Sequence, residues 1–184
     1  MKSTWLSLIV VLACGCTSMK VVPVDSTTGY FPARAKATVV SSKSIDLDQH
    51  KQLILVPNND FLSGELKNIG YFDEVMTFDD MQKAIIQANL GEQIPSMAEM
   101  IGINNAAKRY KPFLWFHVKP RGQGTDQHIQ FILTDATTLE DLLVAETTLD
   151  YMWSGVNDQN NWYPMMNALI DYIRANSKTY HTPK

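Results

Sequence analysis

The sequence has little cysteine, and both cysteines lie close to its beginning. Cys14 and Cys16 are the only two among 184 residues. Because residues 17–184 contain none, that part of the chain has no thiol for a disulfide, a nucleophile or a thiolate metal site. The sequence also lacks a long hydrophobic run. Its best candidate, residues 5–13, is far shorter than the roughly 20 apolar residues that a transmembrane helix needs.

An excess of positive charge is missing as well. Sixteen Lys and Arg residues stand against 19 Asp and Glu residues, which gives a formal net charge of −3. The basic residues are scattered along the chain, whereas a protein that binds phosphates of nucleic acids gathers them on one face. The sequence therefore predicts no nucleic-acid partner.

Several motifs of catalytic and metal sites are also absent. There is no Gly-x-Ser-x-Gly nucleophile elbow and no His-Glu-x-x-His, and none of the four histidines forms a short-spaced pair. His117 and His128 can face each other across a predicted hairpin, and we interpret them as solvent-facing cross-strand side chains. The sequence thus predicts no metal, no cofactor and no enzymatic activity.

What is present at the start of the chain is an export signal. Lys2 supplies a positive charge, Trp5 to Ala13 form a short apolar run, and small Ala13 stands immediately before Cys14. This arrangement is typical of a cleavable signal peptide. The run Val11-Leu12-Ala13-Cys14 resembles the lipobox of bacterial lipoproteins, in which the peptide is cut before the cysteine and that cysteine is acylated.

Two registers of this lipobox compete. Cys14 has Val11 and Ala13 in the expected places and is the favoured lipid attachment site, while Cys16 has only Gly15 before it. An ordinary secretory peptide with two incidental cysteines is the other alternative. Several acyl chains would make the anchor durable, because each buried CH₂ contributes about 0.8 kcal/mol.

The residue that follows the predicted anchor cysteine also predicts the location of the protein. The residue after the cysteine is Gly15 or Thr17 and not aspartate, which resembles lipoproteins sorted to the outer membrane with the protein facing the periplasm. In a bacterium with one membrane, the same anchor would hold the domain on the outer face of the cytoplasmic membrane.

The rest of the chain divides into a tether and one domain. We expect a signal peptide over 1–13, a flexible tether rich in Ser, Thr, Pro and Gly over 14–33, a single α/β domain over 34–178 and a tail over 179–184. A globular domain is expected because apolar residues make up 45% and charged residues 19% of the chain.

Periodicity and capping signals predict the elements of this domain. Gly70 marks a helix end, Ser96 to Glu99 form a capping box, and Gly122 to Gly124 mark a hairpin turn. Strands are predicted within 36–47, 52–57, 71–78, 113–119, 128–134 and 142–153, and helices within 58–70, 77–90, 96–111 and 161–177.

The order of these elements resembles the TolB amino-terminal-domain type of α/β module, which also occurs in lipoproteins of the LpoB and CsgG types. Leu53 to Val56, Leu66 to Phe72 (LKNIGYF) and Phe131 to Thr138 (FILTDATT) carry the resemblance, which spans roughly residues 50 to 177. It implies an α/β (α+β) fold with a mixed sheet, helices packed on it and a C-terminal antiparallel meander of three strands. LpoB-like members switch on a peptidoglycan synthase, whereas CsgG-like members form secretion pores.

Paired carboxylates are the remaining candidates for acid–base chemistry. Asp79 with Asp80 and Glu140 with Asp141 both stand at the start of an element or at a turn. Acidic side chains at such positions bind free backbone amides, so capping explains them without catalysis.

The most unusual stretch is Tyr151 to Pro164 (YMWSGVNDQNNWYP), where aromatic residues flank five consecutive amide or acid residues. Such groups suit recognition of a protein or a glycan, since rings supply contact area and amides supply directed hydrogen bonds. The alternative is that Trp153 and Trp162 face the core. The candidate partner-binding residues are Trp153, Asn157, Asp158, Trp162 and Tyr163.

Together these features predict a lipoprotein held on a membrane by its acylated cysteine, with a non-enzymatic domain that binds another envelope component. An envelope glycan hydrolase and a structural subunit of a trans-envelope assembly are the alternatives. A hydrolase requires a cleft with converging carboxylates, and a structural subunit requires self-association.

Overall fold

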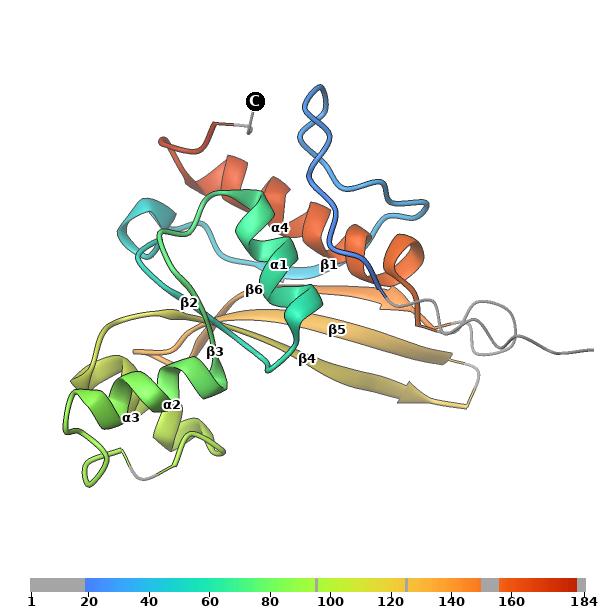
Figure 1. The fold of residues 1–184 in the computed structure, drawn as a ribbon. Helices are drawn as coiled ribbons and strands as arrows, with labels where there is room; N and C mark the ends of the chain where they lie inside the picture. The colour runs from blue at the N-terminus through green and yellow to red at the C-terminus, as the bar shows by residue number, and fades with distance from the viewer. Residues whose placement is uncertain (1–18, 95, 125, 150–155, 182–184) are drawn as a thin grey trace, which may run out of the picture.

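The computed structural model describes residues 19–94, 96–124, 126–149 and 156–181. The predicted signal peptide, both candidate anchor cysteines Cys14 and Cys16, and Trp153 therefore lie outside the described residues. The described chain is an α+β domain with a mixed six-stranded sheet (Figure 1). Its strands are β1 (Thr38–Ser42), β2 (Ile54–Val56), β3 (Val75–Thr77), β4 (Leu114–Gln123), β5 (Asp126–Asp135) and β6 (Glu140–Thr148).

The strands are ordered β1-β6-β5-β4-β2-β3. The strands β4, β5 and β6 form the predicted antiparallel meander, and β1 adds to it as an antiparallel edge strand. In contrast, β2 runs parallel to both β3 and β4. The β4–β5 hairpin turns at Gly122 and Gly124, whose φ angles are +86° and +62°. A Cβ on Gly122 would lie 1.9 Å from the carbonyl oxygen of Asp126, so this turn requires glycine.

Local signals begin α1 (Asp60–Ile69) and α2 (Phe78–Gln87) where the sequence predicted them. Asn59 accepts a hydrogen bond from the Leu62 amide at the start of α1, and left-handed Gly70 ends it. A reciprocal capping box of Thr77 and Asp80 begins α2.

The predicted capping box of Ser96 to Glu99 is wrong. The helix there, α3 (Met100–Arg109), begins at Met100, its N-cap Glu99 makes no side-chain capping bond, and the Ser96 hydroxyl accepts from the Ala98 amide instead. The remaining helical elements are α4 (Tyr163–Asn176), the 3₁₀ turn η1 (Leu47–Gln49) and the π turn η2 (Asp158–Trp162).

These helices cover the two faces of the sheet unequally. The helices α1 and α4 lie over one face, and α2 and α3 pack under the other face at the β2–β3 end (Figure 1). Because β2 is covered on both sides, Leu53 and Leu55 enter one core while Ile54 and Val56 enter the other. The larger core centres on Phe116 and Phe131, which are fully buried and stack with ring centroids 4.8 Å apart. On the α2–α3 side, no described helix covers the rest of the same face of β4, β5 and β6, which we call the open face (Figure 1).

The N-terminal segment differs most from its prediction. The sequence predicted a flexible tether over 14–33, but residues 19–33 lie against α1 and α4. Phe31 is 3% exposed, and its backbone exchanges two hydrogen bonds with the side chain of Asn167 in α4. The Val22 amide donates to the Glu65 carboxylate of α1 at 2.8 Å. Apolar residues at irregular spacing hold this segment on the domain surface, so periodicity does not reveal it.

Over the described ranges, every helix is too short or too polar to cross a membrane.

Candidate functional site

The described part of the segment predicted to recognise a partner, residues 156–164, packs against the domain. Tyr163 is 2% exposed and stacks on Phe31, with ring centroids 5.6 Å apart. Trp162 packs half-buried against the same core, which is the alternative role considered for it. Neither residue forms an exposed aromatic surface, and Tyr163 in particular has almost no ring area free for a partner.

The polar side chains of this segment form hydrogen bonds that hold its backbone in place. The Asn157 side chain accepts from the Asn160 amide at 2.8 Å and caps η2, while Asp158 accepts from the Gln159 amide. Asn161 is 1% exposed and bonds to the Thr147 hydroxyl and the Thr148 carbonyl of β6. Asn161 therefore holds η2 against the end of β6.

The open face of the sheet carries a polar network. Strand register places Arg121 and His128 as direct neighbours, and Gln130 beside Glu146. Glu146 accepts from Arg121 at 2.8 Å and from Gln130 at 2.9 Å. Hydrogen bonds from Gln130 and Arg121 hold the pKa of Glu146 below its ordinary value. This carboxylate stays ionised and satisfied, so it is a poor general acid.

A second group of hydrogen-bonded side chains on this face has the residue types of a catalytic triad but lacks an exposed nucleophile. The Thr134 hydroxyl donates to Asp141 at 2.6 Å and lies 3.1 Å from the His117 Nε2 atom. Burial lowers the pKa of His117, which keeps its ring neutral. A nucleophile must be presented to substrate, but Thr134 is 1% exposed and its hydroxyl proton already points to a carboxylate. This group therefore stabilises the meander.

The two histidines share a face but are not cross-strand partners. His117 pairs with Ile132 and His128 with Arg121, so the rings lie at different positions along the hairpin. The strand predicted within 128–134 is confirmed as part of β5, in which Phe131 and Leu133 enter the core while Gln130 and Thr134 take the opposite face. Within the described ranges, no three His, Asp or Glu side chains are grouped to hold a metal ion.

The adjacent carboxylates have separate structural partners. Asp80 accepts from the Thr77 amide and hydroxyl in the capping box, and these bonds lower its pKa. Asp79 accepts from the Asn58 amide group at 2.8 Å. Glu140 pairs with Lys43 across to β1, and Asp141 bonds to Thr134. The capping interpretation is confirmed for Asp80.

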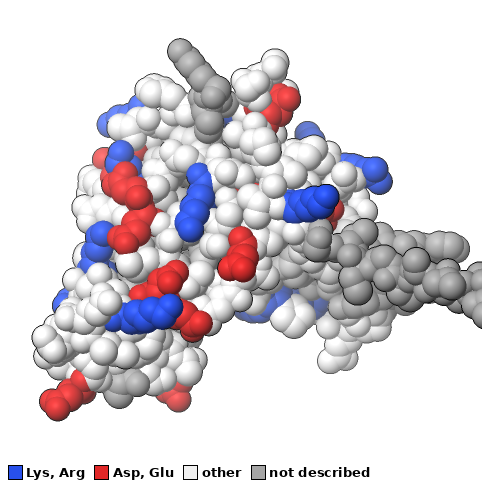
Figure 2. Space-filling model, viewed as in Figure 1, with Lys and Arg blue, Asp and Glu red and all other residues white. Residues whose placement is uncertain are grey.

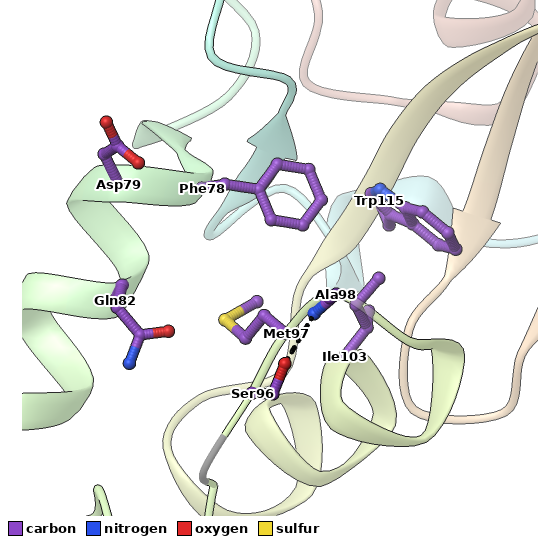
Figure 3. A pocket seen from close by; sticks show the side chains of 8 residues that line it. All are labelled: Phe78, Asp79, Gln82, Ser96, Met97, Ala98, Ile103 and Trp115. Atoms are coloured by element: carbon purple, nitrogen blue, oxygen red, sulfur yellow. Dashed lines mark hydrogen bonds between the residues drawn. The ribbon is translucent and has the colours of Figure 1, made fainter.

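A candidate ligand site is a hollow between α2, α3 and β4 (Figure 3). Its volume is about 410 Å³, and we refer to it as the α2–α3 hollow. In the close-up view, the rings of Phe78 and Trp115 and the thioether of Met97 converge on one space. The full lining is Phe78, Asp79, Gln82, Ser96, Met97, Ala98, Ile103 and Trp115.

Three local features build this hollow. The capping box starts α2 so that Phe78 is its first residue. Gly102 lets the chain at Ser96 pass against α3, because a Cβ there would lie 1.8 Å from the Ser96 carbonyl oxygen. The Asn104 side chain donates to the carbonyls of Ala136 and Thr137, which holds α3 against the β5–β6 turn.

The hollow combines apolar and polar side chains and has few reactive groups. Asp79 is its single titratable lining residue, and its carboxylate already bonds to Asn58. The Ser96 hydroxyl accepts from the Ala98 amide, and neither histidine nor lysine lines the space. This combination can bind an apolar group but has no acid–base pair and no activated nucleophile.

Trp115 joins the hollow to the open face of the sheet. Its ring stacks on His117, with centroids 3.9 Å apart and an interplanar angle of 15°. The buried Trp115 Nε1 atom has no hydrogen-bond acceptor in the described chain. Met100 and Ile101, the first two residues of α3, are 54% and 67% exposed.

Sequence reasoning did not find this site. Phe78, Met97 and Trp115 come from a helix start, a loop and a strand, and nothing in their local patterns indicates that they meet.

Charge on the visible surface is mixed. Lysine and arginine side chains are interspersed with aspartate and glutamate over the face in Figure 2. On the described part of that face, the basic residues are not gathered into one extended area.

Comparisons with known proteins give two distant structural likenesses. No family model and no curated protein matches the sequence. The LpoB C-terminal domain from Salmonella enterica is similar with 15% identity and a TM-score of 0.36, covering 55% of this chain and 84% of that one. A PelC dodecamer variant from Paraburkholderia phytofirmans is similar with 13% identity and a TM-score of 0.32, covering 77% of this chain and 98% of that one. At these scores neither likeness carries an argument about function, and the lipoprotein character remains a prediction.

Proposed function

We propose that this protein is an envelope lipoprotein whose α+β domain binds another envelope protein through the α2–α3 hollow and catalyses no reaction. The observation that carries the proposal is the hollow itself, in which Phe78, Met97 and Trp115 converge on one space. Protein interfaces concentrate binding energy where a few apolar or aromatic side chains enter a pocket of the partner.

The chemistry of the lining favours a protein side chain over a glycan. Lining residues Phe78, Met97, Ile103 and Trp115 are apolar or aromatic, and Gln82, Asp79 and Ser96 form the polar part. Asp79 and Ser96 are already engaged in hydrogen bonds with their own chain. A glycan requires many free directed donors and acceptors, whereas an aliphatic or aromatic side chain requires mainly apolar area.

The anchor supplies the location in this proposal. The lipobox-like run ending at Cys14, with Cys16 as the alternative, supports acylation and membrane attachment. The residue after either cysteine supports sorting to the outer membrane, with the domain facing the periplasm. The partner would then be an envelope protein within reach of the anchored domain.

Two substitutions test the hollow directly. Ala98 is exposed and lines the hollow, so Ala98→Trp fills the space and Ala98→Glu places a charge in it without removing core atoms. Ala88 is an exposed alanine at the end of α2 and does not line the hollow, so Ala88→Trp and Ala88→Glu are matched controls. Urea unfolding of all four variants checks that the domain stays folded.

The measurement is affinity capture from solubilised envelopes, quantified by mass spectrometry. We expect the wild-type chain and both Ala88 variants to retain one envelope protein that both Ala98 variants lose. Equal capture by all five proteins would contradict the proposed binding site. Release of soluble fragments from purified peptidoglycan, abolished by Asp141→Asn or Glu146→Gln, would contradict the non-enzymatic role and favour a hydrolase.

A further inference from the structure

A second surface of the molecule lies at the edge of the sheet. Strand β1 pairs with β6 on one side and stands last in the strand order, so its other edge has no described strand beside it. All five of its residues are exposed, including Val39 at 50% and Val40 at 48%. The outward peptide groups of an edge strand are free to pair with a further extended chain.

A groove runs beside this edge. Its volume is about 620 Å³, and it lies between the start of β1, the preceding segment from Thr28 and the outer side of α4. Val39 is the lining residue from β1, Lys36 and Ala37 come from the segment just before the strand, and Pro164 and Ala168 belong to α4. An extended chain paired with β1 directs every second side chain to one face, so the groove is placed to receive alternate side chains of that chain.

The groove has unpaired positive charge. Arg34 and Lys36 line it, both are exposed, and no described carboxylate lies within ion-pair distance of either. The one acidic lining residue, Asp171, accepts a hydrogen bond from the Tyr30 hydroxyl. Because two cations, Arg34 and Lys36, stand against the single carboxylate of Asp171, the lining has a net positive formal charge.

We infer that β1 and this groove bind an extended segment of a partner protein that carries carboxylates opposite Arg34 and Lys36. Backbone pairing with β1 orients the bound segment along the strand. Its small apolar side chains fit beside Val39 and Ala168, and Arg34 and Lys36 favour acidic residues in the segment. This surface is distinct from the α2–α3 hollow, with which it shares no lining residue.

A second copy of the chain fits this edge less well. Antiparallel pairing of two β1 strands about Val40 brings the Lys36 end of one strand against the Lys43 end of the other. Like charges in opposed positions destabilise a strand pair. The irregular register between Val39 and Ser41 also interrupts the regular pairing that a symmetric sheet extension needs. A partner segment with acidic residues at its ends places no like charges opposite Lys36, and its pairing with β1 does not have to be symmetric.

Synthetic peptides can probe this surface of the full-length protein in detergent micelles. The test probe is a fluorescent nine-residue peptide of alternating threonine and valine, with two glutamates at each end. One control replaces the glutamates by glutamines, a second replaces them by lysines, and a third carries N-methyl groups on the valine amides. We expect binding of the acidic peptide by fluorescence anisotropy, at least about tenfold weaker binding of the glutamine peptide, and none of the N-methylated one.

Protein variants reverse the charge selection. The double variant Arg34→Glu with Lys36→Glu changes two exposed residues and is expected to prefer the lysine-flanked peptide. Equal affinity for acidic and lysine-flanked peptides, or no binding of either, would overturn the inference. A concentration-dependent dimer of the peptide-free protein that Val40→Lys abolishes would assign β1 to a second copy and also overturn it. Ala98→Trp should leave peptide affinity unchanged, which separates this result from a failure of the proposed function.

Discussion

At the scale of single residues, Glu65 is unusual because its carboxyl group is buried and only partly hydrogen-bonded. Its side chain is fully buried, Oε1 accepts from the Val22 amide, and Oε2 has no hydrogen-bond partner. Burial, opposed by the Val22 hydrogen bond and reinforced by nearby Asp158, raises the pKa of Glu65 from about 4.5 to about 7. The folded protein thus holds a proton that the unfolded chain releases at lower pH.

This pKa shift makes stability depend on pH in a defined direction. Because the folded state binds the proton more tightly, the contribution of Glu65 is fully present below about pH 4.5 and is lost as the pH rises to about 7. Glu65→Gln cannot ionise and still offers an oxygen to Val22. We expect it to be more stable than the wild type at pH 8 by on the order of 2 kcal/mol, and equally stable near pH 4.

Urea unfolding at a series of pH values measures this difference. The Asp80 and Glu146 carboxylates, whose pKa values are lowered, change stability in the opposite direction at acidic pH but are common to both proteins. A constant difference between Glu65→Gln and wild type from pH 4 to pH 8 would show that Glu65 keeps an ordinary pKa.

At the scale of elements, the N-terminal segment decides where the domain begins. Phe31 is 3% exposed and stacks on Tyr163, so Phe31→Ala removes a core side chain if residues 19–33 belong to the domain. We expect this substitution to lower the free energy of unfolding by about 3 kcal/mol. The matched control is Ile86→Ala, which removes a 61% exposed side chain from α2 and should change stability by less than about 0.5 kcal/mol.

Urea denaturation of both variants checks this prediction. An unchanged midpoint for Phe31→Ala would mean that the segment is a free tether, as its composition suggested.

Elements fixed by local signals could be predicted from the sequence. The capping residue Thr77, the left-handed Gly70 and the Gly122 turn each satisfy a need of their own backbone within a few residues. The meander followed from alternation in β5. The N-terminal segment could not be predicted in this way, because Phe31 bonds to Asn167 across 136 positions of sequence.

The candidate site was hidden for the same reason. Trp162 and Tyr163 were candidate partner-binding residues because they are aromatic and adjoin a polar loop. Tyr163, however, is buried beneath the N-terminal segment. Trp115 was one residue of an ordinary strand until α2 and α3 brought Phe78 and Met97 beside it. Such a site depends on how helices pack on a sheet, which hydrophobic pattern alone does not specify.

At the scale of the whole molecule, we predict that a lipid anchor holds the binding domain on a membrane. We predict that mass spectrometry of the mature protein finds acyl groups on Cys14 and an N-terminus at that residue. Cys14→Ala should then release the protein into the soluble fraction, while Cys16→Ala leaves it in the membrane. Release by Cys16→Ala alone would move the attachment site to Cys16, and acylation of neither residue would leave an ordinary secreted protein.

The central claim is that the anchored domain docks an envelope protein in the α2–α3 hollow, and photocrosslinking in living cells tests it most directly. A photoreactive amino acid is placed at position 98 in the hollow or at position 88 outside it, each in the wild-type, Cys14→Ala and Cys16→Ala backgrounds. The account predicts one envelope protein crosslinked from position 98 of the anchored chain, lost in Cys14→Ala and absent from position 88. Identical products from both positions, or no envelope protein from position 98, would contradict it.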